Sequence, residues 1–231
     1  MERLVLVHGS VTNGATTWGA QRPLAERYRL LVLERPGFPP GPPVERVDFE
    51  EHADWVAERL EPGDHLAGHS YGGVITLLAA ARFGNLRSLT VIEPPSLDVA
   101  RGDPAVEAFV QAATALWEQE PKEPEAFLRA FLRQVGSTYD PPTPLPPAIE
   151  QGARALMVER LTLEAKIPLA ELCALPFPKL VVSGGHHPAF DAVCDVLERE
   201  LEAERAVLPG AGHAVQRAPG FNERLQAFLE G

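Results

Sequence analysis

The sequence predicts an α/β protein with a mostly parallel sheet of about six strands, flanked by helices and carrying a helical insertion. Three observations lead to this expectation. Short apolar runs alternate with helical patterns along most of the chain. These runs are apolar on both faces, which is typical of parallel strands that are covered on two sides. Between two of the runs, one long segment has only helical periodicity.

The elements follow in a regular order. The expected strands are Leu4–Val7, Leu30–Leu33, His65–Ala67, Leu89–Ile92, Leu180–Val182 and Ala206–Leu208. The helices expected between and after them are Ala53–Leu60, Gly72–Phe83, Phe190–Glu202 and Phe221–Leu229. Right-handed crossovers restrict how such strands can be ordered in a sheet. Residues 1–96 and 173–231 are therefore expected to form one α/β core.

The segment 97–172 is expected to be a helical cap inserted in this core. Its apolar residues recur at helical spacing within Val106–Trp117, Phe127–Leu132 and Ile149–Leu161. The proline-rich stretch Asp140–Pro147 separates the last two of these helices and should be extended. Aromatic side chains such as Trp18, Trp117 and Phe131 either line a pocket or pack in the core.

Composition excludes several classes of partner. The net charge of −11 disfavours binding to a nucleic-acid backbone, which needs clustered Lys and Arg. No apolar run is long enough to span a membrane, and the N-terminus lacks a cleavable signal pattern. Cys173 and Cys194 lie in apolar surroundings and are expected to be reduced, buried thiols. A cytoplasmic protein that acts on a small molecule is expected, and the sequence indicates no particular oligomeric state.

The stretch Gly68-His69-Ser70-Tyr71-Gly72 carries the strongest functional signal. It lies between an expected strand and an expected helix and fits G-x-S-x-G, the pattern of a nucleophile elbow. The glycines allow a tight turn in which a Cβ would collide with neighbouring backbone. The N-terminal end of the new helix faces the serine, where an oxyanion can develop. A phosphate-binding loop is the weaker reading, because His69 and Tyr71 are bulky.

A serine nucleophile needs a base, and the best candidate is His213. It follows the last expected strand in Leu208-Pro209-Gly210-Ala211-Gly212-His213. With Val7-His8-Gly9-Ser10 after the first strand and Gly68–Gly73 at the elbow, the chain resembles the α/β-hydrolase superfamily over nearly its whole length. Because the chain begins at the strand before His8-Gly9, the resemblance is to a compact, capped form with a serine nucleophile.

The resemblance implies a role for each matching residue. Ser70 would be the nucleophile and His213 its general base. The backbone N–H groups of Tyr71 and Ser10 would form the oxyanion hole. His8 and His69 are expected to hydrogen-bond to loop backbone instead of taking part in chemistry.

The acidic member of the triad departs from the family pattern. Where the family places Asp after the penultimate strand, this chain has His187, which cannot replace a buried carboxylate. Glu93, at the end of the strand after the elbow helix, is the favoured acid, because haloalkane dehalogenases and some other members of the fold place theirs there. Asp191 is the alternative. Neither choice needs a cofactor, and no metal is expected at His186-His187, because no ligand cluster accompanies them in the sequence.

The sequence thus favours a serine hydrolase that cleaves a small, mostly apolar ester, thioester or lactone through an acyl-serine. Two alternatives stay open. The missing Asp at position 187 is compatible with a degraded hydrolase fold that only binds a ligand. The same triad also serves carbon–carbon hydrolases and lyases.

Overall fold

The computed structural model describes residues 1–119 and 123–231, and it contains one six-stranded sheet in the order β2-β1-β3-β4-β5-β6. All neighbouring strands are parallel. The strands are β1 (Arg3–Val7), β2 (Arg29–Leu33), β3 (His65–His69), β4 (Ser88–Ile92), β5 (Lys179–Ser183) and β6 (Glu204–Val207). The predicted parallel α/β fold is confirmed.

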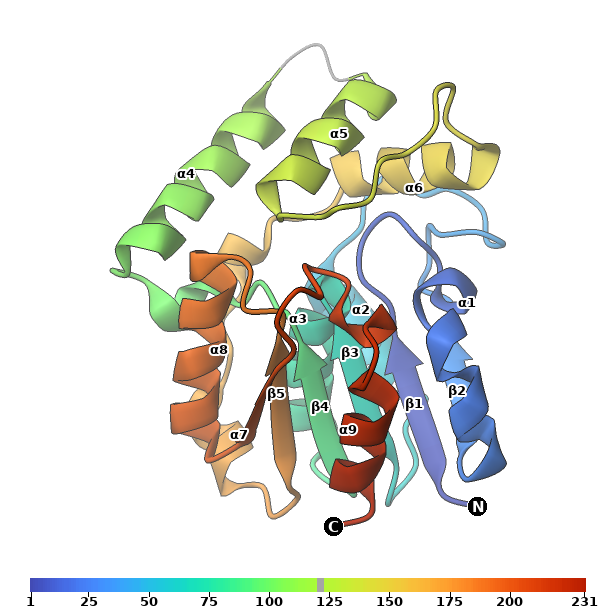
Figure 1. Ribbon diagram of the computed structural model, residues 1–231, viewed down its shortest axis with the longest axis vertical. Coiled ribbons are helices and arrows are strands. Elements are labelled where there is room, and N and C mark those ends of the chain that lie inside the picture. The colour runs from blue at the N-terminus through green and yellow to red at the C-terminus, as the bar shows by residue number, and fades with distance from the viewer. Residues whose placement is uncertain (120–122) are drawn as a thin grey trace.

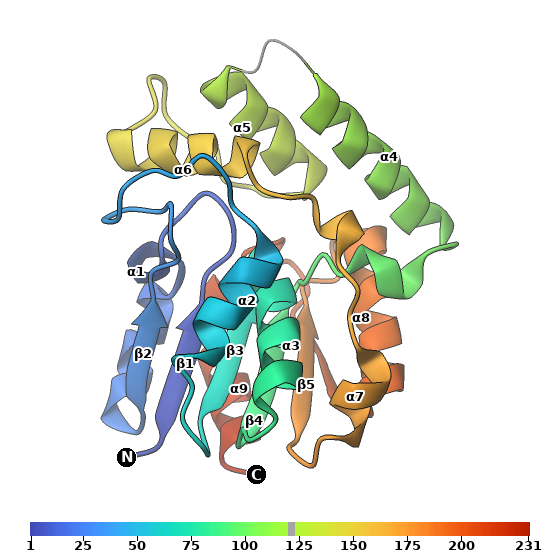
Figure 2. The same cartoon turned by 180° about the vertical axis from the view of Figure 1, so that it is seen from behind.

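Helices cover both faces of the sheet (Figures 1 and 2). Those of the α/β part are α1 (Gly14–Thr17), α2 (Phe49–Ala57), α3 (Tyr71–Phe83), α7 (Leu169–Ala174), α8 (Pro188–Leu201) and α9 (Phe221–Leu229). Short 3-10 segments are η1 (Gly19–Glu26), η2 (Leu97–Ala100), η3 (Thr162–Glu164) and η4 (Val215–Arg217). Helix α2 begins four residues before its predicted start, because Asp48 caps it by accepting hydrogen bonds from the N–H groups of Glu50 and Glu51.

Alternate side chains of each strand enter two different cores. Val5 and Val7 of β1 pack with α2, α3 and α8, whereas Leu4 and Leu6 pack with η1 and α9. Trp18 belongs to this second core and therefore does not line a pocket under the cap. Because the central strands β1, β3, β4 and β5 are buried on both faces, their sequences show an apolar run and no alternation.

Helices α4 (Pro104–Glu118), α5 (Pro124–Gln134) and α6 (Pro147–Met157) lie across the carboxyl ends of the strands (Figure 1). We call these three the cap helices. Each begins with a proline, which lacks the N–H that a first helical residue leaves unpaired anyway. They form a core of their own, which includes Leu116, Phe127 and Leu156. The bounds 97–172 for the inserted unit stay a prediction.

Both cysteines are free, as expected, but only Cys194 is buried; Cys173 is partly exposed. In the described residues, every helix is too short or too polar to cross a bilayer.

Close packing around the β3–α3 turn gives a direct test of the fold. A Cβ on Gly72 would lie against the carbonyl oxygens of Val7 and His8, nearer than Cβ atoms approach backbone in folded proteins. We expect Gly72→Ala to lower the free energy of unfolding by about 2 kcal/mol or more, because rigid backbone must shift to make room.

Gly19→Ala is the matched control, since no heavy atom lies within 4 Å of its added Cβ. Its free energy of unfolding should change by less than about 1 kcal/mol. Urea denaturation of both variants measures the difference. Equal effects at Gly72 and Gly19 would contradict this packing.

Candidate active site

Ser70 occupies the strained position of the β3–α3 turn. Its φ of 55° lies in the left-handed region, which a residue other than glycine rarely adopts. The turn is held by a hydrogen bond of 2.8 Å from the Ser70 N–H to the Ile92 carbonyl of the neighbouring strand. A Cβ on Gly68 would collide with the backbone of Gly72, so the turn can close only with glycine at that position. This conformation places the hydroxyl at the carboxyl edge of the sheet.

His213 joins Ser70 to Glu93. The distance from His213 Nε2 to Ser70 Oγ is 2.9 Å, and that from His213 Nδ1 to Glu93 Oε2 is 3.2 Å. The second carboxylate oxygen of Glu93 accepts a 2.6 Å hydrogen bond from the Gly184 N–H. The three side chains come from the turn after β3, the end of β4 and the loop after β6. They form one hydrogen-bonded chain in a buried site.

Asp191 is not part of this chain. It lies in the first turn of α8, where its Oδ1 accepts a 2.9 Å hydrogen bond from the Ser183 hydroxyl. His187 caps the same helix, because its Nδ1 accepts from the Ala189 N–H at 3.2 Å. Of the two carboxylates that the sequence offered, Glu93 is the one that faces His213.

Burial sets the protonation of the site. Burial and the adjacent His186 and His187 lower the pKa of His213, so its imidazole is neutral and Nε2 can accept the Ser70 proton. Burial raises the pKa of Glu93, and the hydrogen bond from Gly184 opposes that rise. His69 is also kept neutral by burial, and its Nε2–H donates to the His213 carbonyl at 2.8 Å. That bond fixes the loop that carries the base.

Two backbone N–H groups lie free beside Ser70. Those of Tyr71 and Ser10 donate to no protein acceptor within the described residues. Both residues line the same pocket as Ser70. Tyr71 begins α3, so its N–H belongs to the positive end of that helix. Two unpaired donors beside a nucleophile are what an oxyanion hole requires.

A buried ion pair supports the loop that carries Ser10. Arg35 donates to the Gly9 carbonyl at 2.9 Å and to Glu159 Oε1 at 3.1 Å. Glu159 Oε2 accepts from the Ser10 hydroxyl at 2.5 Å, and Trp117 Nε1 donates to the Glu159 carbonyl. Sequence reasoning missed this network, because the two charged residues lie 124 positions apart and belong to no motif.

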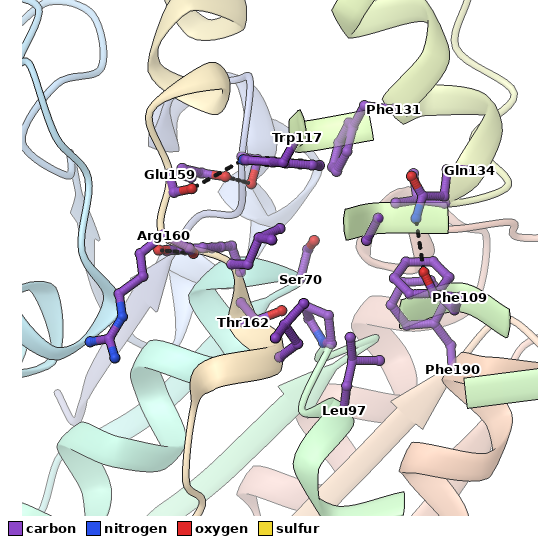
Figure 3. Close-up of a pocket in the computed structure, with 17 residues that line it drawn as sticks. Ser70, Leu97, Phe109, Trp117, Phe131, Gln134, Glu159, Arg160, Thr162 and Phe190 are labelled. Atoms are coloured by element: carbon purple, nitrogen blue, oxygen red, sulfur yellow. Dashed lines mark hydrogen bonds between the residues drawn. The ribbon is translucent and has the colours of Figure 1, made fainter. Parts of the chain in front are cut away.

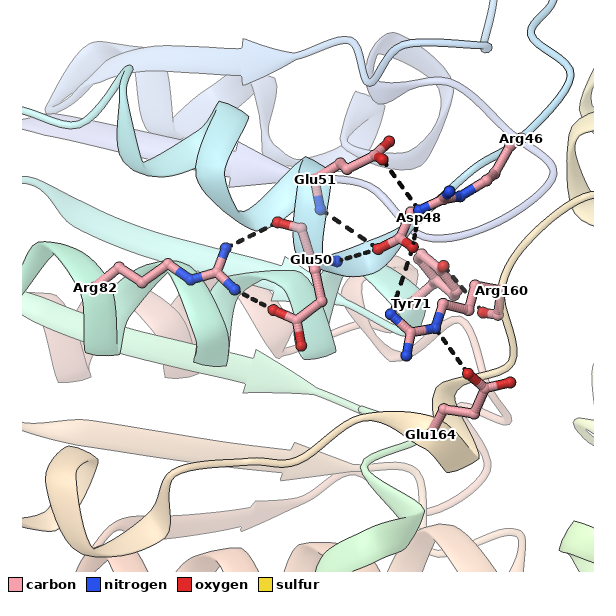
Figure 4. A network of polar contacts seen from close by, with 8 residues as sticks. All are labelled: Arg46, Asp48, Glu50, Glu51, Tyr71, Arg82, Arg160 and Glu164. Carbon is pink, nitrogen blue, oxygen red and sulfur yellow. Dashed lines mark hydrogen bonds and ion pairs between the residues drawn. The ribbon is translucent and has the colours of Figure 1, made fainter.

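A second network ties Tyr71 to the same segment (Figure 4). The Tyr71 hydroxyl donates to the Arg160 carbonyl at 3.1 Å, and the Arg160 side chain reaches Glu164 and Asp48. Asp48 is also the N-cap of α2 and accepts from Arg46. Residues 159 and 160, after the cap helices, are thus bonded to both expected oxyanion-hole residues.

A pocket of about 530 Å³, its open mouth included, lies between Ser70 and the cap helices (Figure 3). Its wall is mostly apolar and includes Leu97, Phe109, Trp117, Phe131, Leu161 and Phe190. The Arg160 guanidinium points away from it, toward Glu164 (Figure 3). A second cavity beside Ser70 is lined by His213 and by more polar residues, including Thr12, Ser137 and Gln216.

Glu93, His186 and His213 are the only group of three metal-ligating side chains that comes together in the part of the chain that the structure describes. The His186 Nδ1 lies 3.7 Å from Glu93 Oε2. The sequence could not predict this group, because its members lie in three separate loops.

The buried ion pair gives a stability prediction. Glu159→Leu leaves the Arg35 charge buried without its partner, and we expect the free energy of unfolding to fall by about 3–5 kcal/mol. Glu164→Leu is the control, because Glu164 pairs with Arg160 at the surface and should contribute less than about 1 kcal/mol. Denaturant unfolding of both variants tests the difference. A loss at Glu159 no larger than that at Glu164 would show that the buried pair is not needed.

Comparison with known proteins agrees with this geometry. The chain is similar over nearly its whole length to the dihydrolipoyllysine-residue acetyltransferase component of the acetoin cleaving system of Pseudomonas putida. It is 31% identical over an alignment of 241 residues, which covers 98% of this chain and 63% of the relative. The pimeloyl-[acyl-carrier protein] methyl ester esterase of Aeromonas salmonicida is 35% identical over 105 residues, 43% of this chain and 41% of the esterase. The chain therefore matches less than two thirds of the length of either relative.

Among solved structures, an N-acyl homoserine lactonase in complex with N-hexanoyl homoserine has the same fold. Its TM-score is 0.70 at 20% identity, over 99% of this chain and 88% of the lactonase. The sequence pattern of the alpha/beta hydrolase family matches residues 4–222. Together with the parallel sheet and the serine at the turn after β3, this match shows that the chain belongs to the alpha/beta hydrolase family.

Proposed function

We propose that this protein is a serine hydrolase that cleaves a small, mostly apolar carboxylic ester, thioester or lactone. The observation that carries the proposal is the hydrogen-bonded chain from Ser70 Oγ through His213 to Glu93. A serine hydroxyl is a poor nucleophile until a neighbouring imidazole takes its proton. Family membership alone would not carry this proposal, because one fold supports many reactions.

The reaction follows from these contacts. As Ser70 Oγ attacks the carbonyl carbon, its proton moves to His213 Nε2, and Glu93 stabilises the imidazolium through Nδ1–H. The N–H groups of Tyr71 and Ser10 receive the negative oxygen of the tetrahedral intermediate. When the bond to the leaving group breaks, His213 returns the proton to that group and an acyl-Ser70 remains. Water then attacks the acyl group with His213 as base, and the carboxylic acid leaves.

The two cavities beside Ser70 indicate where the substrate parts lie. His213 must protonate the leaving group, so that group lies in the cavity that His213 lines. The acyl group then lies in the apolar pocket under the cap helices. Similarity to the Aeromonas methyl ester esterase supports an ester substrate.

The two alternatives receive less support. The case for a hydrolase fold that has lost its activity and only binds a ligand rests on the missing Asp at position 187. That case is weakened because another carboxylate, Glu93, lies within hydrogen-bond distance of His213 Nδ1. A carbon–carbon hydrolase or lyase would use the same triad, and no described contact favours either over ester cleavage.

Hydrolysis of p-nitrophenyl butyrate tests the proposal. Ser70→Ala should lower kcat/KM by about 10⁴-fold or more, and Glu93→Gln by about 10³-fold to 10⁴-fold, because the imidazolium loses its carboxylate. Asp191→Asn is the control and should stay within about threefold of wild type, since Asp191 contacts Ser183 and not His213.

Circular dichroism would establish that each variant is folded. Two results would contradict the proposal: full activity in Ser70→Ala, or an equal loss in Asp191→Asn and Glu93→Gln.

A further inference from the structure

His186 has a ring nitrogen with no partner. Its Nε2 lies 3.0 Å from the Val135 carbonyl, which can only accept, so Nε2 carries the proton. In the neutral ring, Nδ1 is then a lone pair. This Nδ1 is buried and has no hydrogen-bond partner within the described residues.

The atoms nearest to the His186 Nδ1 lone pair include another acceptor, a carboxylate oxygen of Glu93. Glu93 Oε2, a carboxylate oxygen, lies 3.7 Å from His186 Nδ1, which is too long for a hydrogen bond. The ligand atoms of Glu93, His186 and His213 all lie within 4.8 Å of one another. With the His186 ring neutral, its Nδ1 and the Glu93 carboxylate oxygen are both acceptors at close range, and a cation between them would satisfy both. A buried polar atom without a partner needs such an explanation.

Two of the three separations between the ligand atoms are close to those of a tetrahedral zinc site. Zinc bonds to His nitrogen and carboxylate oxygen of about 2.0–2.2 Å separate two ligand atoms by about 3.4 Å. Glu93 Oε2 lies 3.2 Å from His213 Nδ1 and 3.7 Å from His186 Nδ1, one on each side of that value. Two imidazoles and one carboxylate are ligands that Zn²⁺ takes, with a fourth position left for water.

Hydrogen bonds with neighbouring backbone groups hold two of the three ligands in a fixed orientation. The Val135 carbonyl fixes the His186 ring, and the Gly184 N–H fixes the far oxygen of Glu93. Bonds of this kind hold metal ligands in place in metalloproteins. Of the three ligands, His213 also lines the polar cavity beside Ser70 and Thr12.

We propose that Glu93, His186 and His213 form a binding site for Zn²⁺, and that zinc bound there inhibits the hydrolase. The inhibition rests on the proposed function, whereas the binding does not. Zinc on His213 Nδ1 moves the single proton of the neutral ring to Nε2. Nε2 then becomes a donor and can no longer accept the Ser70 proton. The carboxylate of Glu93 is withdrawn from the imidazole at the same time.

Zinc binding can be measured directly by competition with a chromophoric zinc indicator. Wild type should bind one equivalent, and both His186→Ala and His186→Gln should weaken binding about tenfold or more, because a ligand is lost. His187→Ala is the control and should bind like wild type, since His187 caps α8 and lies outside the group. Co²⁺ in place of Zn²⁺ should give the visible absorption of a tetrahedral site in wild type and lose it in both His186 variants. Equal zinc affinity in wild type and in both His186 variants would overturn the proposal.

Inhibition provides the second readout. Zn²⁺ should inhibit hydrolysis of p-nitrophenyl butyrate by wild type at the concentration at which it binds, and EDTA should reverse the effect. Mg²⁺ should not inhibit, because it prefers oxygen ligands. Zinc binding without any hydrolysis after EDTA would refute the proposed function and leave the site intact. If the protein hydrolyses the ester but zinc neither binds to it nor inhibits it, the proposed zinc site is refuted and the proposed function stands.

Discussion

The structure depends on the close approach of the β3–α3 turn to the loop after β1. Gly72 and Gly9 permit it, because a Cβ on Gly72 would collide with the carbonyl oxygens of Val7 and His8, and a Cβ on Gly9 with the His69 carbonyl oxygen and the Ser70 side chain. The approach forces Ser70 to a φ of 55° and leaves the N–H groups of Tyr71 and Ser10 beside its hydroxyl. Strain at a single residue is tolerated where the surrounding contacts hold it in place, and such residues cluster at active sites. The proposed nucleophile and both proposed oxyanion donors thus depend on one packing constraint.

A second set of contacts holds the loops at the carboxyl edge of the sheet in place around Ser70. The Arg35–Glu159 pair is buried, and a buried pair costs desolvation that its attraction only partly offsets. It bonds the Gly9 carbonyl and the Ser10 hydroxyl, and the next residue, Arg160, accepts from the Tyr71 hydroxyl. The segment that returns from the cap helices is therefore fastened to both sides of Ser70. We interpret the pair as a device that fixes the oxyanion loop and the wall of the acyl pocket together.

Local patterns in the sequence predicted the sheet, the cap helices and the elbow, because each depends on neighbouring residues. The sequence favours Glu93 because it ends a strand at the edge where Ser70 also lies, and Asp191 stays open as the alternative. In the structure Asp191 on helix α8 contacts Ser183, whereas Glu93 contacts His213. Arg35 and Glu159 were missed, because they belong to no motif and only the folded chain brings them together. No metal is expected from the sequence at His186-His187, because Glu93 and His213, which complete the group of three, lie far from His186 along the chain. The fold brings five residues close together: Ser70, His213, Glu93, Tyr71 and Ser10. Their catalytic roles remain predictions.

Labelling with a fluorophosphonate, followed by peptide mass spectrometry, tests the central claim most directly. Such a probe reacts only with a serine that a base has activated, and its product resembles the tetrahedral intermediate. We expect one equivalent of label on Ser70, at a rate that falls in Glu93→Gln and is unchanged in Asp191→Asn. A folded protein that takes no label, or takes it on another residue, would contradict the claim that Ser70, His213 and Glu93 act as one catalytic unit.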